Sequence, residues 1–469
     1  MKAQAQGAVE REQGLSRQLT SRQLAMIAIG GAIGTGLFLG SSLAVRSAGP
    51  SVILTYVLGA LIALLLMGAL SEMAAAHPTA GSFGVYAEMY VSRWAGFVVR
   101  YTYWAVQCIA IGGEATAVAI YCRLWWPGVP GWVWIIAFSL GLVYVNARSV
   151  ASFGEFEYWF AMIKVVAIIL FIILGASLLL GLGPKPAIGL VNYTSNGGFM
   201  PHGLKGAWTA LVFVIFGYIG TEVVAVTSGE ARDPQTAVPR AMKSMVSRLI
   251  VFYLLAIIVL IGVVPWNQIQ PGADVTASPF VRVFQLIGIP AAAHIINFVV
   301  LTAALSSMNC NLYLVTRMMF SLSRGGYAPS RLGALSSKGT PVNALLISAV
   351  GLLVATTVAL LYPNQAYVYL FGVSLFGGLF VWLMIFLTHL FFRRKWEAAY
   401  GVSGGRPAFR MWGYPYTTLL GLALITAILA TTWWAEGMRI TLIAGLPWLA
   451  IISLAYFIWS KSRGKVASS

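Results

Sequence analysis

The sequence predicts an all-α integral membrane protein with twelve transmembrane helices. Of its 469 residues, 59% are hydrophobic and only 9% are charged, and the mean hydropathy is +0.83. Soluble domains contain about 25% charged residues, so this composition does not fit a water-soluble globular protein. The apolar residues also gather into runs of mostly about 18–28 residues, the length that crosses a hydrocarbon layer of about 30 Å as a helix.

Twelve such runs follow one another along the chain. We expect spans at 23–45, 51–75, 97–126, 131–148, 157–183, 207–229, 249–270, 292–320, 342–361, 366–392, 415–436 and 440–460. The polar segment 1–22 and the short segment 461–469 are then tails outside the bilayer.

The basic residues indicate how these spans are oriented. With an even number of spans, both termini lie on one side of the membrane. Twenty-three of the 30 Lys and Arg residues fall on that side, six fall opposite, and Lys164 falls inside a span. Cytoplasmic loops carry the basic excess, so both termini are expected in the cytoplasm. The net charge of +17 is thus a consequence of topology, and no nucleic-acid partner is expected.

Residue types that carry covalent or metal chemistry are few and scattered. The 3 cysteines and 4 histidines form none of the short spacings that bind metals or mark a catalytic site. We therefore expect no metal, no cofactor and no enzyme activity. The sequence shows no nucleophile–base pair, which a membrane enzyme would need. It also shows no sizeable soluble domain, which a non-transporting sensor, the other alternative, would need.

An internal repeat divides the spans into two units. Ile33-Gly34-Thr35 lies near the middle of the first span, and Ile219-Gly220-Thr221 begins 186 residues later, near the middle of the sixth. A unit of five spans repeated once places its two copies in opposite orientations, which is typical of secondary transporters. The predicted repeats are 23–183 and 207–392, with 415–460 outside them.

The first span is also rich in glycine. The stretch "IAIGGAIGTGLFLG", residues 27–40, holds five glycines, each of which weakens a helix by roughly 0.8–1 kcal/mol relative to alanine. A helix broken here exposes N–H groups on one half and C=O groups on the other, which match a ligand with a carboxylate and an ammonium. We expect breaks near Gly34–Thr35 and Gly217–Ile219. The alternative is close helix packing through GxxxG spacing, as in Gly30 and Gly34.

Ionisable residues inside spans are costly and therefore suggest function. Glu114 follows two glycines deep in the third span, where it either lines a pocket or orders the bundle as a hydrogen-bonded neutral acid. Glu222 follows the sixth-span triplet, where it either holds the broken backbone or carries protons. Lys164, about seven residues into the fifth span, either acts in the site or extends to the cytoplasmic interface.

Four stretches resemble a known family, the bacterial amino acid transporters of the amino acid–polyamine–organocation superfamily. They are "LTSRQLAMIAIGGAIGTGLFLGS", "FGEFEYWFAMIKVVAI", "FGYIGTEVVAVTSGEARDPQTAVPRA" and "NFVVLTAALSSMNCNLYLVTRMMFSLSRGGYAPSRL". The resemblance covers roughly residues 15–460. It implies a leucine-transporter-type 5+5 inverted repeat with discontinuous helices 1 and 6, and a cytoplasmic loop after span 6 that contains Pro234 and Pro239.

The resemblance also implies roles for individual residues. The substrate carboxylate would meet the backbone at Ala32, Ile33, Gly34, Thr35 and Gly36, and the ammonium would meet carbonyls around Phe216, Gly217 and Ile219. Glu114 matches an acidic position of the family's third span. Lys164 matches a lysine that replaces the ion held between spans 1 and 8 in sodium-driven relatives, with Ser306 and Ser307 as its potential partners.

Together these features predict a proton-coupled amino acid importer of the cytoplasmic membrane that works by alternating access around a site near the midplane. Its expected partners are an amino acid, protons and the lipid bilayer. An amino acid or polyamine exchanger is the alternative within transport.

Overall fold

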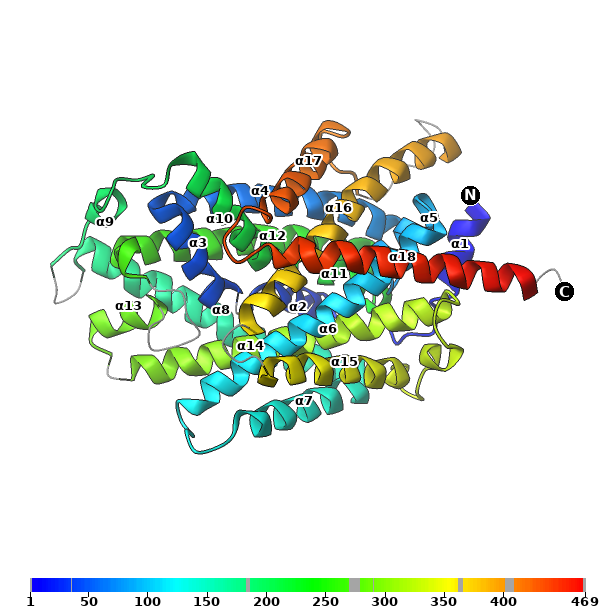
Figure 1. The fold of residues 1–469 in the computed structure, drawn as a ribbon, viewed down its shortest axis with the longest axis horizontal. Helices are drawn as coiled ribbons and strands as arrows, with labels where there is room; N and C mark the ends of the chain where they lie inside the picture. Colours follow the sequence, from blue (N-terminus) through cyan, green and yellow to red (C-terminus); the bar gives the residue numbers. More distant parts are fainter. Residues whose placement is uncertain are drawn as a thin grey trace.

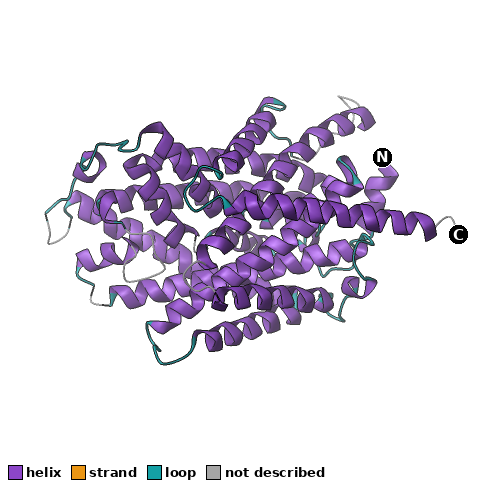
Figure 2. Cartoon of the chain, viewed as in Figure 1, coloured by secondary structure: helices purple, strands orange, loops and turns teal. Residues whose placement is uncertain are grey.

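The computed structural model describes residues 2–34, 36–182, 186–269, 279–289, 291–361, 366–400 and 409–466. These residues form helices and connecting loops without a β-strand (Figure 2); the sole extended pairing among them is an isolated bridge between Leu19 and Ala231. The predicted all-helical class is therefore confirmed over the described ranges.

Eight helical segments in the described ranges are long and apolar enough to cross a membrane. They are Gly36–Ala76, Arg93–Arg123, Gly131–Arg148, Val150–Leu180, Gly203–Glu230, Ala292–Arg324, Tyr369–Ala399 and Ile440–Ser462. Three shorter apolar helical stretches, Ile250–Val263, Val342–Gly351 and Tyr416–Thr431, complete this set. Helices α7 (Gly131–Arg148) and α15 (Val342–Leu361) have the predicted bounds.

The two largest errors in the predicted helix starts have a shared reason. Helix α8 (Val150–Leu180) begins seven residues before the expected 157, and α12 (Pro234–Val263) begins at the first proline of the expected loop. Proline is favoured at the first helical position because its missing N–H has no intrahelical partner there. In both cases a polar stretch continues the apolar helix, which hydropathy alone does not reveal. The loop after the sixth span is therefore much shorter than expected.

The first glycine-rich segment is broken as predicted. Helix α2 (Ser21–Ala32) starts at a capping box formed by Thr20 and Gln23, and it ends where Ile33 turns to φ −85° and ψ 87°. A short π-helix, η1 (Gly36–Gly40), and α3 (Ser41–Ala48) then continue the chain. Thr35 lies outside the described residues.

The second break lies at the end of the predicted range Gly217–Ile219. Helix α10 (Gly203–Tyr218) still includes Gly217; the chain becomes extended at Ile219 and resumes as α11 (Val223–Thr227). Gly220 has φ +105°, and a Cβ added to it would lie 2.5 Å from the carbonyl oxygen of Gly31. The two breaks therefore touch backbone to backbone, and glycine at 220 meets both the conformational and the spatial demand.

Helix α2 lies at the centre of the bundle (Figure 1), where it contacts α8, α12 and α14 (Ala292–Arg324). Helix α6 (Arg93–Arg123) packs along α14. Among the other long helices, α4 (Val52–Ala76) packs on α12, and α16 (Ala366–Tyr400) packs on α6. Helices α17 (Tyr416–Thr431) and α18 (Ile440–Val466) pack on α16. Helix α1 (Lys2–Glu10) and the end of α18 lie at the same end of the molecule (Figure 1).

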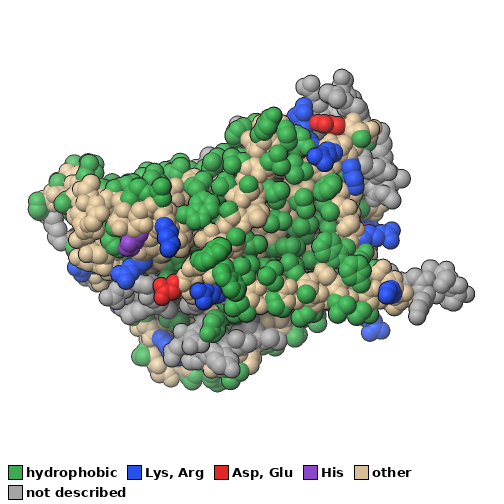
Figure 3. All heavy atoms as spheres, turned by 45° about the horizontal axis from the view of Figure 1, so that its top comes forward, with side chains coloured by type: hydrophobic (Ala, Val, Ile, Leu, Met, Phe, Trp, Pro, Cys, Tyr) green, Lys and Arg blue, Asp and Glu red, His purple; other side chains and the backbone are tan. Residues whose placement is uncertain are grey.

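The outer surface is apolar, as a lipid-facing surface must be. Large hydrophobic side chains of α18 are more than half exposed, among them Ile451, Leu454 and Ile458. Figure 3 shows hydrophobic side chains over much of one face, with Lys and Arg side chains sparse across its middle. In water such a surface would be an aggregation hazard, whereas in a bilayer it is the expected contact with lipid.

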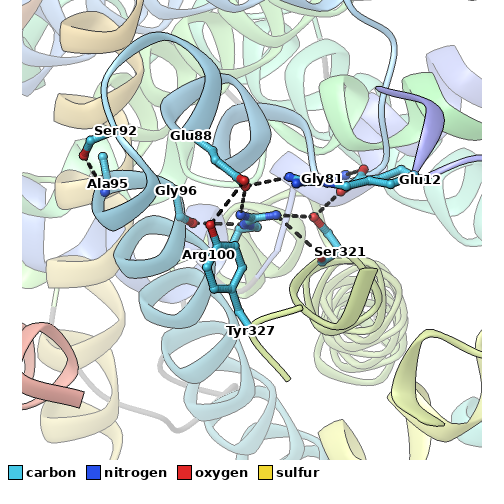
Figure 4. A network of polar contacts seen from close by, with 10 residues as sticks. Glu12, Gly81, Glu88, Ser92, Ala95, Gly96, Arg100, Ser321 and Tyr327 are labelled. Atoms are coloured by element: carbon cyan, nitrogen blue, oxygen red, sulfur yellow. Dashed lines mark hydrogen bonds and ion pairs between the residues drawn. The ribbon is translucent and has the colours of Figure 1, made fainter. Parts of the chain in front are cut away.

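An ionic network fixes the N-terminal segment (residues 2–19) against the ends of three helices (Figure 4). Glu12 accepts hydrogen bonds from the main-chain N–H of Gly81, at 2.7 Å, and from the Ser321 hydroxyl. Arg100, fully buried on α6, donates to Ser321 Oγ at 2.9 Å and forms an ion pair with Glu88 of α5 (Ser82–Tyr90). Glu88 also pairs with Arg11 at 2.6 Å. The network therefore joins residues far apart in the sequence at one end of the molecule.

Candidate functional site

The two helix breaks border a cavity of about 60 Å³. The predicted site residues that line it are Ala32, Gly34, Gly36, Glu114, Phe216, Gly217, Ile219 and Ser307. Ile33, Lys164, Glu222 and Ser306 are not among the lining residues. In the described ranges no group of three or more His, Cys, Asp or Glu residues could hold a metal ion.

Lys164 is fully buried beside the first break. Its Nζ donates to the carbonyl oxygens of Gly30 at 2.6 Å and Ile33 at 2.7 Å, which lie at the C-terminal end of α2. Because α8 begins at Val150, Lys164 lies fourteen residues into the helix, about 21 Å along its axis. The ammonium is bonded inside the bundle, which contradicts the alternative in which this side chain extends to the interface. The ammonium instead stabilises carbonyls that a broken helix leaves without partners.

Ser306 and Ser307 of α14 take different places. The Ser306 hydroxyl accepts a hydrogen bond from Lys164 Nζ at 2.8 Å, as the resemblance implied. Ser307 lines the cavity instead, where its Oγ would lie 3.1 Å from a Cβ added to Gly34. Adjacent residues of a helix point about 100° apart, so one serine reaches the lysine and the other reaches the cavity.

Glu157 is a residue of this region that the sequence analysis did not single out. It is fully buried on α8 and accepts hydrogen bonds from Ser306 Oγ and from Asn309 Nδ2, the latter at 3.1 Å. Asn309 is held in turn by Asn146, whose Nδ2 lies 2.7 Å from its Oδ1. The spacing of seven residues between Glu157 and Lys164, two helical turns, was the available signal that both occupy one face of α8.

Glu222 holds the second break. Its carboxylate accepts from the main-chain N–H of Gly220 at 3.0 Å, from the Tyr103 hydroxyl at 2.9 Å and from Trp382 Nε1 at 3.3 Å. These donors come from the break itself, from α6 and from α16. The arrangement satisfies a main-chain N–H that the broken helix would otherwise leave unpaired, which fits the structural alternative for this residue.

Tyr253 of α12 connects the two broken helices. Its hydroxyl lies 2.8 Å from the carbonyl oxygen of Ala32 and 2.9 Å from that of Gly217. The single hydroxyl proton is shared between these two acceptors, and the carbonyl oxygen of Ala32 also accepts from the main-chain N–H of Gly34 at 3.1 Å. Sequence patterns gave no signal for this contact, because a buried tyrosine in an apolar helix is common.

The lining of the cavity mixes polar and aromatic groups. Glu114 faces the first break, and its Oε1 would lie 3.2 Å from a Cβ added to Gly34. Gln107 and Asn311 add polar lining, and Phe216 packs on Phe371 with ring centroids 4.0 Å apart. A cavity with a few polar groups and an aromatic wall is typical of a small-molecule site.

The segment before α2 and the segment after α11 are joined to each other and to α14. Glu230, which follows α11, forms a buried ion pair with Arg317 of α14 at 2.9 Å. The main-chain N–H of Leu19 donates to the Glu230 carbonyl at 3.1 Å, and the N–H of Arg232 donates to the Leu19 carbonyl at 3.2 Å. The segment that leads into α2 is therefore tied to the segment that follows α11.

Comparison with known proteins matches this chain to one family. A family model described as amino acid permease matches residues 23–466. A gamma-aminobutyric acid permease of Bacillus subtilis is 37% identical over 453 residues, covering 96% of this chain and 95% of the relative. The aromatic amino acid transport protein AroP of Escherichia coli is 36% identical over 452 residues, covering 96% and 97%.

A solved structure supports the fold independently of close sequence similarity. A manganese transporter of Eremococcus coleocola superposes with a TM-score of 0.59 at 14% identity, covering 94% of this chain and 93% of the other. That likeness concerns the fold alone. With the apolar helices described above, the matches make this chain a multi-pass membrane protein, and it belongs to the amino acid permease family of the amino acid–polyamine–organocation superfamily.

Proposed function

We propose that this protein imports amino acids across the cytoplasmic membrane by proton symport, through alternating access. The observation that carries the coupling proposal is the contact of the Lys164 ammonium with the carbonyl oxygens of Gly30 and Ile33 at the first helix break. A titratable group is thereby attached to the segment that borders the cavity. No covalent step is part of this mechanism, so the protein acts as a carrier and not as an enzyme.

The broken helices supply binding groups for the substrate main chain. The N-terminal start of η1 at Gly36 presents N–H groups with partial positive charge, which suits a carboxylate. The carbonyl end of α10, at Phe216, Gly217 and Ile219, suits an ammonium. Ala32, Ile33, Gly34 and Thr35 form the rest of the first break in this proposal, and Glu114 lies close to Gly34 on its cavity side.

We propose twelve spans arranged as a 5+5 inverted repeat of the leucine-transporter type. The first repeat covers 23–183, the second covers 207–392, and 415–460 is peripheral. Support comes from the broken helices α2–α3 and α10–α11, which occupy corresponding places in the two halves. Both termini lie in the cytoplasm in this arrangement, in agreement with α1 and the end of α18 lying together (Figure 1).

Alternating access requires that the cavity be closed toward one side at a time. The ion pair between Glu230 and Arg317 and the network around Arg100 join the cytoplasmic ends of the helices below the cavity. We propose that these contacts break when the site opens to the cytoplasm. Lys164 then changes its protonation as its surroundings change, so that substrate and proton favour the same conformation.

An amino acid or polyamine exchanger is the second candidate, and a non-transporting sensor is the third. An exchanger needs no titratable group at the break, so the place of Lys164 favours the symporter. The family also consists of permeases, which favours transport over sensing.

The test is uptake by purified protein in liposomes. The standard amino acids and γ-aminobutyrate are offered as labelled probes, with and without an imposed pH gradient. A symporter accumulates its substrate in response to the gradient, whereas an exchanger does so only against a preloaded amino acid and a sensor does not transport. Lys164→Ala is expected to lose gradient-driven accumulation. A variant that still accumulates substrate as the parent does would show that the proton binds elsewhere.

A further inference from the structure

We propose that Glu157 is the partner with which Lys164 shares its proton, and that the Ser306 hydroxyl is the bridge between them. The inference rests on the proposed proton symport and deepens it, because it makes the coupling site a pair of residues and not a single lysine. Glu157 is a positioning and proton-sharing residue in this proposal; it does not line the cavity and does not touch the substrate.

The hydrogen bonds run in one direction from the ammonium to the carboxylate. Lys164 Nζ donates to Ser306 Oγ at 2.8 Å, and Ser306 Oγ donates to Glu157 Oε1. The serine hydroxyl has one proton and gives it to the carboxylate, so its lone pair is available for the ammonium. The second carboxylate oxygen receives Asn309 Nδ2 at 3.1 Å. All four side chains of Lys164, Ser306, Glu157 and Asn309 are fully buried.

Charge balance favours the pairing. An isolated ammonium or carboxylate in a water-free interior is very costly, and one charge of each sign offsets most of that cost when the two are linked by hydrogen bonds. The other titratable groups that interact with Lys164 are Cys310 of α14 and Glu114 of α6. Glu114 lines the cavity and Cys310 is a thiol, whereas α2 presents carbonyl oxygens. Glu157 is therefore the carboxylate linked to the lysine through a single hydroxyl.

The glycine at position 30 makes room for this carboxylate. A Cβ added to Gly30 would overlap Glu157 Oε1, so any larger residue would displace the acid from its place against α2. Gly30 contacts both members of the pair, since its main-chain carbonyl also receives Lys164 Nζ at 2.6 Å. Movement of α2 during transport would change the surroundings of both charges together.

The proton transfer balances within the three residues. The Lys164 ammonium gives a proton to Ser306 Oγ while Ser306 gives its hydroxyl proton to Glu157 Oε1. The products are a neutral amine, an intact hydroxyl and a neutral carboxylic acid, and the sum of the charges stays zero. One further proton from outside gives an ammonium beside a carboxylic acid, with a net charge of one. The neutral amine holds the carbonyls of Gly30 and Ile33 more weakly, which frees α2 to move.

The test compares Glu157→Gln with the parent in liposomes, using the labelled amino acid that the parent accumulates most. We expect the variant to keep exchange of internal for external substrate, which needs no net proton movement. Gradient-driven accumulation is expected to fall to the level seen without a gradient, and the pH profile of uptake is expected to flatten. The matched control is Glu155→Gln on the same helix, an exposed carboxylate that bonds Trp159 Nε1 at 2.9 Å and is expected to match the parent.

A second pair of variants covers the case in which Glu157→Gln does not fold. Ser306→Ala removes the bridge and leaves both charges in place, whereas Ser306→Thr keeps the hydroxyl. We expect loss of gradient-driven accumulation in the first and its retention in the second. Accumulation equal to the parent in Glu157→Gln or in Ser306→Ala overturns the proposal. A parent that does not respond to the gradient overturns the symport proposal itself, which is a different outcome.

Discussion

The Tyr253 hydroxyl lies 2.8 Å from the carbonyl oxygen of Ala32, so a side chain of α12 caps the residue at which α2 ends. The same hydroxyl lies 2.9 Å from the carbonyl oxygen of Gly217. Both acceptors border the cavity, and a substrate ammonium has three protons with which to replace the single one of tyrosine.

Tyr253→Phe is therefore expected to lower the stability of the protein, and to lower it less when substrate is bound. The carbonyl of Ala32 keeps its hydrogen bond from the Gly34 N–H, so the loss falls on the carbonyl of Gly217. Leaving a buried acceptor without its donor costs about 1–3 kcal/mol, and a bound ammonium would restore part of that loss. Thermal unfolding of the detergent-solubilised protein with and without substrate measures both effects. Tyr193→Phe is the control, because it removes a 2.8 Å bond to the carbonyl of Ile258, a residue that does not line the cavity. An equal effect of substrate on the two variants would contradict the prediction.

Glu114→Gln is expected to weaken substrate binding without preventing folding. The carboxylate faces the first break, and a hydrogen bond to a charged group is worth about 1.5–3 kcal/mol, so the dissociation constant should rise by about tenfold to a hundredfold. Competition of unlabelled amino acids for uptake measures the change across substrates. Glu436→Gln, an exposed carboxylate in the loop after α17, is the control. Unchanged competition for every amino acid would return Glu114 to a purely structural role.

Gly220→Ala is expected to abolish transport and to destabilise the protein. The residue has φ +105°, and its added Cβ would lie 2.5 Å from the Gly31 carbonyl oxygen, so strain and backbone collision add together. Gly203→Ala separates the two effects, since Gly203 has φ +60° and no atom within 4 Å of an added Cβ. The left-handed strain alone costs roughly 1–2 kcal/mol. Gly220→Ala should therefore show much lower uptake and a much lower unfolding temperature than Gly203→Ala. Similar values for the two variants would argue against contact between the two breaks.

Arg100→Gln is expected to release the N-terminal segment. The substitution removes the ion pair between Arg100 and Glu88, which leaves Glu88 with Arg11 as its charged partner. Loss of the Ser321 contact also removes a support of Glu12. Trypsin should then cleave at Arg11 and Arg17 faster in the variant than in the parent. The exposed Arg123, at the other end of α6, gives the control Arg123→Gln; cleavage of Arg100→Gln at the parent rate would contradict the prediction.

His77 is expected to make stability depend on pH. It follows the last residue of α4, and burial lowers its pKa from 6.5 to about 4. Between these values the unfolded chain binds the proton and the folded chain does not, so stability falls as the pH drops from 6.5 toward 4. Over the whole of this pH range the free energy of unfolding falls by about 3 kcal/mol.

Thermal unfolding of parent and His77→Gln across this range provides the check. The variant should show a shallower decline, because glutamine does not take up a proton. His202→Gln, at an exposed histidine before α10, is the control and should follow the parent. Parallel plots of stability against pH for His77→Gln and the parent would exclude His77 as the source of the pH dependence.

The amino-acid sequence by itself determined the class of the fold and the position of the first break. Hydropathy over about 20 residues fixes where a helix can cross a bilayer, and it is a local property. Glycine weakens a helix wherever it stands, so the interruption after Ala32 was also readable, and the repeated Ile-Gly-Thr triplet indicated its counterpart after Tyr218. The start of α8 was misplaced because Glu155 and Glu157 make that turn polar while it remains helical.

Only the tertiary structure decided which side chains meet. The contacts of Ser306 with Glu157 and of Tyr253 with Ala32 join residues 149 and 221 positions apart, and they depend on how α8, α12 and α14 pack around α2. A pattern within one helix gives the face on which a residue lies, but not the residue of another helix that this face contacts. The pairing of Lys164 with Glu157 through Ser306 therefore emerged from packing, although every member was visible in the sequence.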